Sequence, residues 1–250
     1  MNEKMPIEHY RSLGSLEDHY WWHQTRYQIV WRVLTERIAD PRSAMIADLG
    51  CGTGGFLRFL RRRGVKRLLG ADYADSALGM LERDGIPTAR IDLEGAFRLP
   101  EGPYDALVAL DVIEHLADER PFLDSVRGNL RAGGLLALTA PAHAFLFSEW
   151  DRTLRHYRRY SRAGVSRLLD GAGFRVLETS HFFSFALPMA VARRYVGAYD
   201  GSAACEFPAV SALLNRALLQ AGRIEGALLR RIRVPFGTSL YVVAQCRQDR

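Results

Sequence analysis

The chain has 250 residues, of which 48% are hydrophobic and 25% are charged, which suits a globular protein with a full core and excludes the disordered and fibrous classes. Its 34 basic and 28 acidic residues give a net charge of +6, carried almost wholly by arginine, and this excess alone is weak support for nucleic-acid binding. Three cysteines without a short common spacing argue against a metal knuckle and a disulfide framework.

Two further features bear on the compartment in which the protein works. No apolar signal-peptide segment opens the chain, and the longest apolar run, 182–192, is too short to span a bilayer. Unpaired cysteines fit a reducing environment. These features lead us to expect a cytoplasmic protein.

Strands and helices alternate through the first half of the chain. Apolar residues at steps of three and four predict one helix from Ser15 to Ile38, closed by Pro41. A buried strand, a glycine loop and a second helix follow at 44–64. We expect further strands at 66–73 and 87–93, a strand from 104 that runs into a loop or helix by 116, and helices at 76–85 and 121–134.

The second half continues this alternation with one interruption. Strands are expected at 135–141, 175–182 and 237–246, and a helix at 162–174, while 182–234 holds two apolar helices that should sit on the sheet. Alternation at these lengths implies right-handed crossovers and a parallel sheet covered on both faces. The fold class is therefore doubly wound α/β, divided into an N-terminal helical lid (1–40), a core (41–181), a helical cap insertion (182–235) and a last core strand (236–250).

The glycine loop between Ile46 and Leu57 has the spacing G-x-G-x-x-G, which lets a ligand approach the backbone but identifies none by itself. Asp48 discriminates between ligands, because it ends the strand that delivers the loop. The repulsion between a carboxylate and a dinucleotide phosphate about 4 Å away would cost roughly 4 kcal/mol of binding free energy. S-adenosylmethionine lacks phosphate and carries positive charge, so Asp48 favours it over NAD.

Two later strand ends carry acids that fit the same ligand. Asp72 ends the next strand, about twenty residues past the loop, where a carboxylate accepts hydrogen bonds from both ribose hydroxyls. Tyr73 can stack on adenine, and Asp92 with Leu93 can meet the adenine edge. Three acids on successive strand ends therefore point to one nucleoside pocket.

These segments, in this order, resemble the class I S-adenosylmethionine-dependent methyltransferases over about residues 45–182. The resemblance implies a seven-stranded, mostly parallel, Rossmann-like sheet with an antiparallel last strand, and S-adenosylhomocysteine as product. It also implies that Asp48 holds the methionine amino end, Asp72 the ribose, and Asp92 with Leu93 the adenine. The expected cofactor-binding residues are Asp48, Gly50, Cys51, Gly52, Asp72, Tyr73, Asp92, Leu93 and Leu110.

Methyl transfer from a sulfonium needs alignment, desolvation and at most a base, so no metal is expected. The candidate catalytic bases are His115, after the fourth strand, and His156, although an Ile-Glu-His turn is also common scaffolding. An arginine-rich segment, 148–162, suits an anionic acceptor, or is a solvated helix start. Trp21 and Trp22 either close a lid or belong to the core. The expected substrate-binding residues are Trp21, Trp22, Arg26, His143, Tyr157, Arg158, Arg159 and Tyr160.

The predicted function is in-line methyl transfer to a small biosynthetic acceptor that is anionic or amphipathic. The alternatives are an RNA or protein methyltransferase, or a cofactor-binding protein that does not methylate. Against RNA, the fourth strand lacks an Asn/Asp-Pro-Pro-Tyr ending and no RNA-binding module is evident. Region 182–234 forms a cap over the acceptor, a homodimer seam or a peripheral membrane anchor, and these readings stay open.

Overall fold

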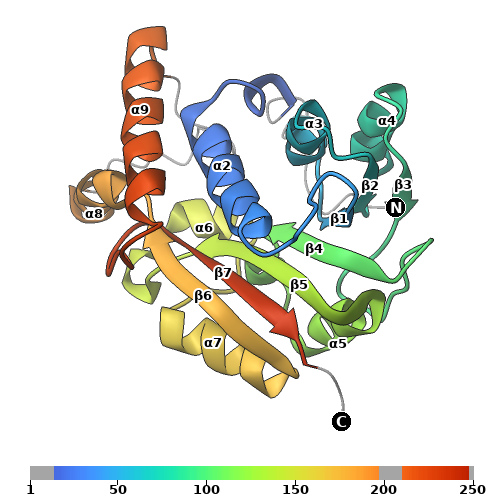
Figure 1. Ribbon diagram of the computed structural model, residues 1–250. Helices are drawn as coiled ribbons and strands as arrows, with labels where there is room; N and C mark the ends of the chain where they lie inside the picture. The colour runs from blue at the N-terminus through green and yellow to red at the C-terminus, as the bar shows by residue number, and fades with distance from the viewer. Residues whose placement is uncertain (1–13, 197–209, 248–250) are drawn as a thin grey trace.

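The computed structural model describes residues 14–196 and 210–247. The first residues of the predicted lid (1–13), the middle of the predicted insertion (197–209) and the last residues of the final segment (248–250) lie outside this part. Within it the strands form one seven-stranded sheet in the order β3-β2-β1-β4-β5-β7-β6 (Figure 1). The strands are β1 (Met45–Leu49), β2 (Arg67–Asp72), β3 (Thr88–Arg90), β4 (Tyr104–Leu110), β5 (Leu130–Pro141), β6 (Phe174–Phe182) and β7 (Ser239–Cys246).

The sheet is parallel except for β7, which runs antiparallel to both β5 and β6. The doubly wound class and the antiparallel last strand are therefore confirmed. The strand order reverses between β1 and β4, and ligands of doubly wound sheets bind at the carboxyl ends of such a pair. The candidate site lies there.

Helices cover both faces of the sheet, as Figure 1 shows. Those in the described residues are α2 (Trp21–Thr35), α3 (Gly55–Arg62), α4 (Asp75–Arg83), α5 (Arg120–Asn129), α6 (Glu149–Thr153), α7 (Arg162–Gly171), α8 (Leu187–Val196) and α9 (Ala212–Leu228). Short 3-10 turns occur at η1 (Ile113–His115), η2 (Ala144–Leu146) and η3 (Ser184–Ala186).

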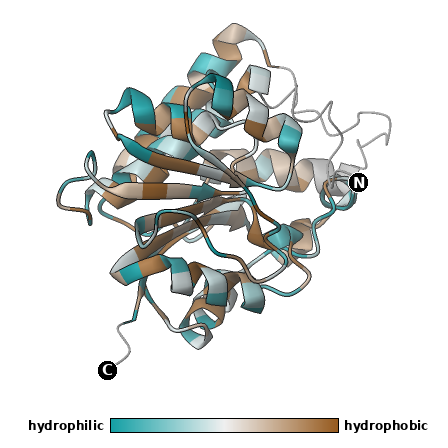
Figure 2. Ribbon diagram, turned by 90° about the vertical axis from the view of Figure 1, so that its right-hand side faces the viewer, coloured by the Kyte–Doolittle hydropathy of each residue, from teal (hydrophilic) through white to brown (hydrophobic). Residues whose placement is uncertain are grey.

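The core is split into two apolar layers because neighbouring residues of a strand face opposite sides of the sheet. In β1, Ile46 joins the cluster formed with α2, α3 and α4, whereas Ala47 joins the cluster formed with α5 and α7. Figure 2 shows the hydrophobic strands lying between these helical layers. The sheet is therefore buried on both faces.

The predicted single helix from Ser15 to Ile38 is wrong at its start. A helical turn at 14–16 is followed by a break, and Tyr20 is extended, with φ −73° and ψ 131°. The free N–H of Trp21 donates to Asn215 Oδ1 of α9 at 2.9 Å. A partner almost two hundred residues away thus fixes the start of α2, which local periodicity does not encode.

Two other expectations change. The strand predicted at 135–141 begins at Leu130, directly after α5, because Tyr104 pairs with Leu130 before a register shift in β4. The helix α9 packs mainly along α2 instead of directly on the sheet, and its Gly222 lies against Thr25. Close approach of the two helices requires a residue without a side chain there.

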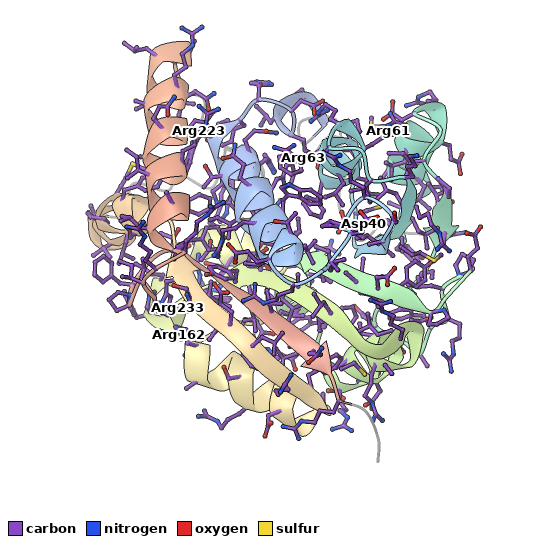
Figure 3. All side chains as sticks on the ribbon, viewed as in Figure 1. Asp40, Arg61, Arg63, Arg162, Arg223 and Arg233 are labelled. Carbon is purple, nitrogen blue, oxygen red and sulfur yellow. The ribbon has the colours of Figure 1, made fainter. Side chains whose placement is uncertain are left out.

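The outer surface of α9 is both apolar and basic. Leu213 is 78% exposed and Ile224 63%, and Figure 3 marks Arg223 on the same helix. Among the described residues, no helix is long and apolar enough to cross a membrane.

Candidate cofactor and acceptor site

The glycine loop turns sharply at the end of β1. Gly50, Gly52 and Gly54 all have positive φ, at 68°, 52° and 88°, a region that favours glycine. A Cβ on Gly50 would also lie 2.7 Å from Val112 Cγ2. The loop therefore needs glycine both for its conformation and for its contact with the segment after β4.

Asp48 lies at the centre of the sheet, opposite Gly70 of β2 and Val108 of β4. It is buried, and its Oδ1 has no hydrogen-bond partner among the described residues. Burial raises the pKa of Asp48 well above its usual range, the Arg26 guanidinium opposes this rise, and the carboxylates of Glu17 and Asp72 add to it. This acceptor atom suits a cationic donor, since burying it unpartnered is unfavourable.

Asp72 fixes the loop against β2. It accepts hydrogen bonds from the backbone N–H of Gly52 at 2.9 Å and of Ala74 at 3.0 Å. Burial raises its pKa, and these N–H groups act in the opposite direction. A carboxylate has about four acceptor positions, so Asp72 retains capacity for a ribose diol.

The remaining predicted cofactor residues lie around the same edge. Leu93 comes within 3.7 Å of a Cβ built on Gly50, and the guanidinium of Arg90 lies 5.4 Å from the Tyr73 ring. Asp92 is exposed and accepts from the N–H of Glu94. Leu110 is buried at the end of β4, and burial raises the pKa of the Cys51 thiol well above its usual value, which keeps it neutral.

The segment before α2 covers the glycine loop through Glu17, a residue that the sequence did not single out. The Glu17 carboxylate accepts from Thr53 Oγ1 at 2.5 Å and from Arg58 at 3.1 Å. Burial raises its pKa, against the effect of these partners. This contact joins residues distant in sequence and has no periodic pattern, so sequence alone carried no signal for it.

Arg26 contacts an acid of the chain itself. Its Nη1 lies 2.5 Å from Asp111 Oδ2, and its guanidinium lies 4.3 Å from the centre of the Trp22 ring. Asp111 has φ 56°, and Thr139 Oγ1 donates to its second oxygen at 2.8 Å. Asp111 directly follows β4, and Asp48 lies at the end of β1. The argument that acids at neighbouring strand ends converge could therefore have identified Asp111 from the sequence.

Trp21 and Trp22 both pack against Phe183, with ring centroids 5.1 Å and 5.9 Å away. Trp21 is buried in the apolar layer above the sheet, whereas Trp22 is partly exposed. Trp22 therefore keeps more exposed surface than Trp21 does.

The arginine-rich segment is held by internal ion pairs. Arg159 makes a forked contact to the buried Asp151, at 2.8 and 3.0 Å, and Arg158 donates to Glu119 at 2.8 Å. The Tyr160 hydroxyl donates to the same Glu119 at 2.6 Å, while Tyr157 is 57% exposed. These contacts seat the segment beside η1.

His143 lies at the edge of this segment with φ 63°. Its ring stacks on His181, with centroids 4.8 Å apart. Burial lowers the pKa of His143, and the positive Arg159 lowers it further. His143 is therefore kept neutral.

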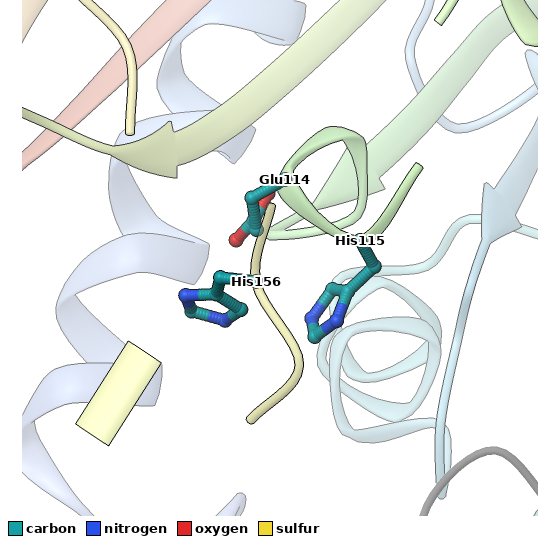
Figure 4. A group of neighbouring side chains, drawn as sticks. All are labelled: Glu114, His115 and His156. Carbon is teal, nitrogen blue, oxygen red and sulfur yellow. The ribbon is translucent and has the colours of Figure 1, made fainter. Parts of the chain in front are cut away.

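Glu114, His115 and His156 form a compact group below the end of β4 (Figure 4). Their metal-ligating atoms all lie within 4.8 Å of one another, and the His115 and His156 rings meet edge to face at 4.7 Å. Glu114 is fully buried, and neither of its oxygens has a hydrogen-bond partner among the described residues. His156 Nδ1 lies 3.0 Å from Asp151 Oδ1.

Residues 21–179 match the model of a methyltransferase domain family, which is more than half of the chain. The chain belongs to the class I S-adenosylmethionine-dependent methyltransferases. The methyltransferase is 28% identical, over 72% of its length and 69% of the relative's, to a probable S-adenosylmethionine-dependent methyltransferase of Mycolicibacterium smegmatis.

Solved structures share the fold of the methyltransferase at low identity. A phosphoethanolamine N-methyltransferase of Haemonchus contortus, with S-adenosyl-L-methionine, gives a TM-score of 0.64 at 16% identity over 98% of this chain and 58% of that one. The cyclase SpnF gives 0.63 at 14% identity over 98% and 96%. Other relatives are named for trans-aconitate, a protein lysine and a tRNA, so their names do not select an acceptor.

The geometry of the methyltransferase fits its cofactor. S-adenosylmethionine supplies a methyl group activated by a sulfonium. Buried acids surround the glycine loop, and Asp48 offers an oxygen that the described residues leave unpartnered. Because Glu17 and Asp72 raise the pKa of Asp48 further, a cationic ligand beside Asp48 would be favoured electrostatically.

Proposed function

We propose that the methyltransferase acts on a small-molecule acceptor whose reacting atom meets the group Glu114, His115 and His156. In-line transfer needs the acceptor atom and the methyl group aligned in a desolvated site. The loop after β1 and the turn after β4 lie on either side of the point where strand order reverses. A cofactor bound at the loop after β1 and an acceptor bound at the turn after β4 would face each other at this reversal.

The observation that carries this proposal is the internal pairing of the arginines near the site. Arg26, Arg158 and Arg159 each contact a carboxylate of the chain that is less than one-fifth exposed. A nucleic-acid substrate requires cationic side chains to neutralise its phosphates. These three arginines already neutralise internal acids, which favours a small acceptor over RNA.

The same pairing bears on the acceptor's charge. An anionic group bound by Arg158 or Arg159 would compete with Glu119 or Asp151. We therefore infer that the site recognises chiefly the reacting atom and the apolar surroundings of Trp22, and that an anionic group on the acceptor is a secondary feature. His115 and His156 are the side chains proposed to meet the acceptor.

Tritiated-methyl transfer tests the proposal directly. The purified protein and labelled S-adenosylmethionine are incubated with cell extract separated into metabolite, lipid, RNA and protein fractions. We expect label in the metabolite fraction, and much less with the Asp48→Asn variant. Label confined to RNA or protein would reject the small-molecule acceptor and leave the family assignment intact.

A further inference from the structure

The Glu114 carboxylate is a buried polar group near the site that the described residues leave without a hydrogen-bond partner. It is fully buried, and both oxygens lack a hydrogen-bond partner within the described part of the chain. Buried polar groups in folded proteins are nearly always paired, and an orphan calls for an ion or water. The nearby acid Asp111 disfavours the ionised form of Glu114, whereas the guanidiniums of Arg26 and Arg159 favour it without bonding to either oxygen. A bound cation would compensate the buried carboxylate in its ionised form.

Two imidazoles lie beside this carboxylate. The ligating atoms of Glu114, His115 and His156 fall within 4.8 Å of one another, and Figure 4 shows the three side chains gathered around one small space. A cation with bonds of about 2.1 Å holds its ligand atoms roughly 3 to 4 Å apart. Side-chain rotations that move the ligating atoms by about an ångström would bring these three atoms to that spacing.

His156 is already oriented as a metal-binding histidine usually is. Its Nδ1 is 3.0 Å from the buried Asp151, which leaves Nε2 for an outside ligand. Asp151 in turn accepts a forked contact from Arg159 and the N–H of Ser148. A carboxylate behind the ring fixes the tautomer and raises the basicity of a histidine ligand.

We propose that Glu114, His115 and His156 bind one divalent first-row transition-metal cation, with remaining positions open to an oxygen of the acceptor. Two imidazoles and one carboxylate suit such cations, and the three ligands leave coordination positions vacant. This inference rests on the proposed function for its role in the reaction, but not for the binding itself. It departs from the expectation of no metal.

The cation gives the acceptor side a chemistry that the side chains alone lack. A hydroxyl bound to a divalent cation loses its proton far more readily than a free one, and the proton passes to solvent water. The oxygen then attacks the methyl carbon, the carbon–sulfur bond breaks, and S-adenosylhomocysteine leaves. His115 and His156 would thus act as ligands and position the acceptor, instead of accepting its proton.

Metal binding is measured on the full chain after treatment with a chelator and exhaustive dialysis. Mn²⁺ is titrated in and its free fraction followed by electron paramagnetic resonance, and Zn²⁺ and Mg²⁺ are then added as competitors. We expect one tight Mn²⁺ per chain, displaced by Zn²⁺ more readily than by Mg²⁺. Affinity should fall at least tenfold in Glu114→Gln and in His156→Gln.

Two further variants sharpen the test. His19→Gln changes an exposed histidine outside the group, and it should leave the affinity unchanged. Asp151→Asn changes a residue that is not itself a proposed ligand, yet it should weaken binding about 10- to 100-fold, because Asp151 holds the His156 ring through Nδ1. Calorimetry with S-adenosylmethionine on the same samples shows that each variant is folded. If Glu114→Gln does not fold, the partly exposed His115→Gln replaces it.

No saturable binding to the native chain, or binding that survives Glu114→Gln, His115→Gln and His156→Gln unchanged, would overturn the proposal. Tight binding without methyl transfer to any metabolite would instead reject the proposed function alone. The two failures are therefore distinguishable.

Discussion

The Arg26 guanidinium lies 2.5 Å from the Asp111 carboxylate, and their side chains are 8% and 19% exposed. This ion pair joins α2 to the residue that follows β4, across the reversal of strand order. The segment before α2 covers the glycine loop through Glu17. The helix α2 and the segment before it are therefore tied to both halves of the site.

A double-mutant cycle at this pair should show strong coupling. Removing one partner leaves the other charge buried, so Arg26→Gln and Asp111→Asn should each lower the free energy of unfolding by about 3 kcal/mol. The double variant should lose less than the sum, with a coupling energy of about 1 to 3 kcal/mol. Urea denaturation followed by circular dichroism measures all four proteins, and additive losses would contradict the role of the pair.

Asp48→Asn should weaken cofactor binding without destabilising the free protein. Hydrogen bonds to charged groups contribute about 1.5–3 kcal/mol, which corresponds to roughly 10- to 100-fold in affinity. In the free protein the buried charge is unfavourable, so its removal should maintain or raise the melting temperature. Calorimetry measures the affinity for the cofactor, and thermal denaturation measures the stability of the free protein. Unchanged affinity would show that Asp48 does not contact the cofactor.

The pH dependence of stability should follow from the Asp48 carboxyl group. Burial raises the pKa of Asp48 well above its usual value, so the folded state binds this proton more tightly than the unfolded state does. Its stabilising contribution is full below the ordinary carboxyl pKa, about 4, and is lost as the pH rises through the raised value. Stabilisation by the cationic cofactor should therefore be larger at about pH 8 than at about pH 5.

Asp48→Asn is the matched control for this pH effect. It removes one raised carboxyl and should flatten the pH profile of the cofactor-induced rise in melting temperature. Asp40 is exposed, and its hydrogen bond with Ser43 lowers its pKa. Asp40→Asn should therefore not flatten the pH profile. Equal profiles for the native protein and Asp48→Asn would contradict the linkage.

How much of the site was predictable depends on where each residue's partners lie. Asp48 and Asp72 end strands that periodicity identifies, and strand ends converge in a parallel sheet, so their proximity follows from sequence. Glu17 acts through Thr53 and Arg58, which are far along the chain. The local sequence pattern does not predict such contacts, because they depend on how distant segments pack together.

The arginine-rich segment is the opposite case, because its composition suggests a bound ligand whereas the structure shows internal carboxylate partners for Arg158 and Arg159. A guanidinium suits a carboxylate of the protein as well as it suits one of a substrate. Asp151, only eight residues from Arg159, was visible in the sequence, but nothing there showed that it would be buried.

Arg159→Gln should therefore act mainly on stability. Burial alone would raise the pKa of Asp151, but hydrogen bonds from His156 and Arg159 outweigh it and lower the pKa. Loss of Arg159 leaves Asp151 short of a partner, and the free energy of unfolding should fall by about 3 kcal/mol near neutral pH. A lowered carboxyl pKa stabilises only above its ordinary value, so the loss should shrink below about pH 4.

Arg152→Gln is the control for that variant, since its ion pair with Glu149 is largely exposed. It should change stability by less than about 1 kcal/mol. A large effect on the acceptor KM from Arg159→Gln, without loss of stability, would restore this arginine as a binding residue.

Two glycines separate the effect of backbone conformation from that of packing. Gly54 and Gly85 both have positive φ, at 88° and 68°. A Cβ on Gly54 would lie 2.1 Å from Leu81 Cδ2, whereas a Cβ on Gly85 would meet nothing within 4 Å. Gly85→Ala should therefore lose only the left-handed penalty of about 1–2 kcal/mol.

Gly54→Ala adds a clash with the buried Leu81 to the same penalty. Overpacking of a core costs about 1–3 kcal/mol more, and the shift of Leu81 would move the loop that ends at α3. We expect a loss of roughly 3 kcal/mol or more, together with weaker cofactor binding, which Gly85→Ala should leave unchanged. Urea denaturation and calorimetry on the two variants measure this difference. Equal losses in both would mean that backbone conformation alone, and not the contact with Leu81, requires glycine in the loop.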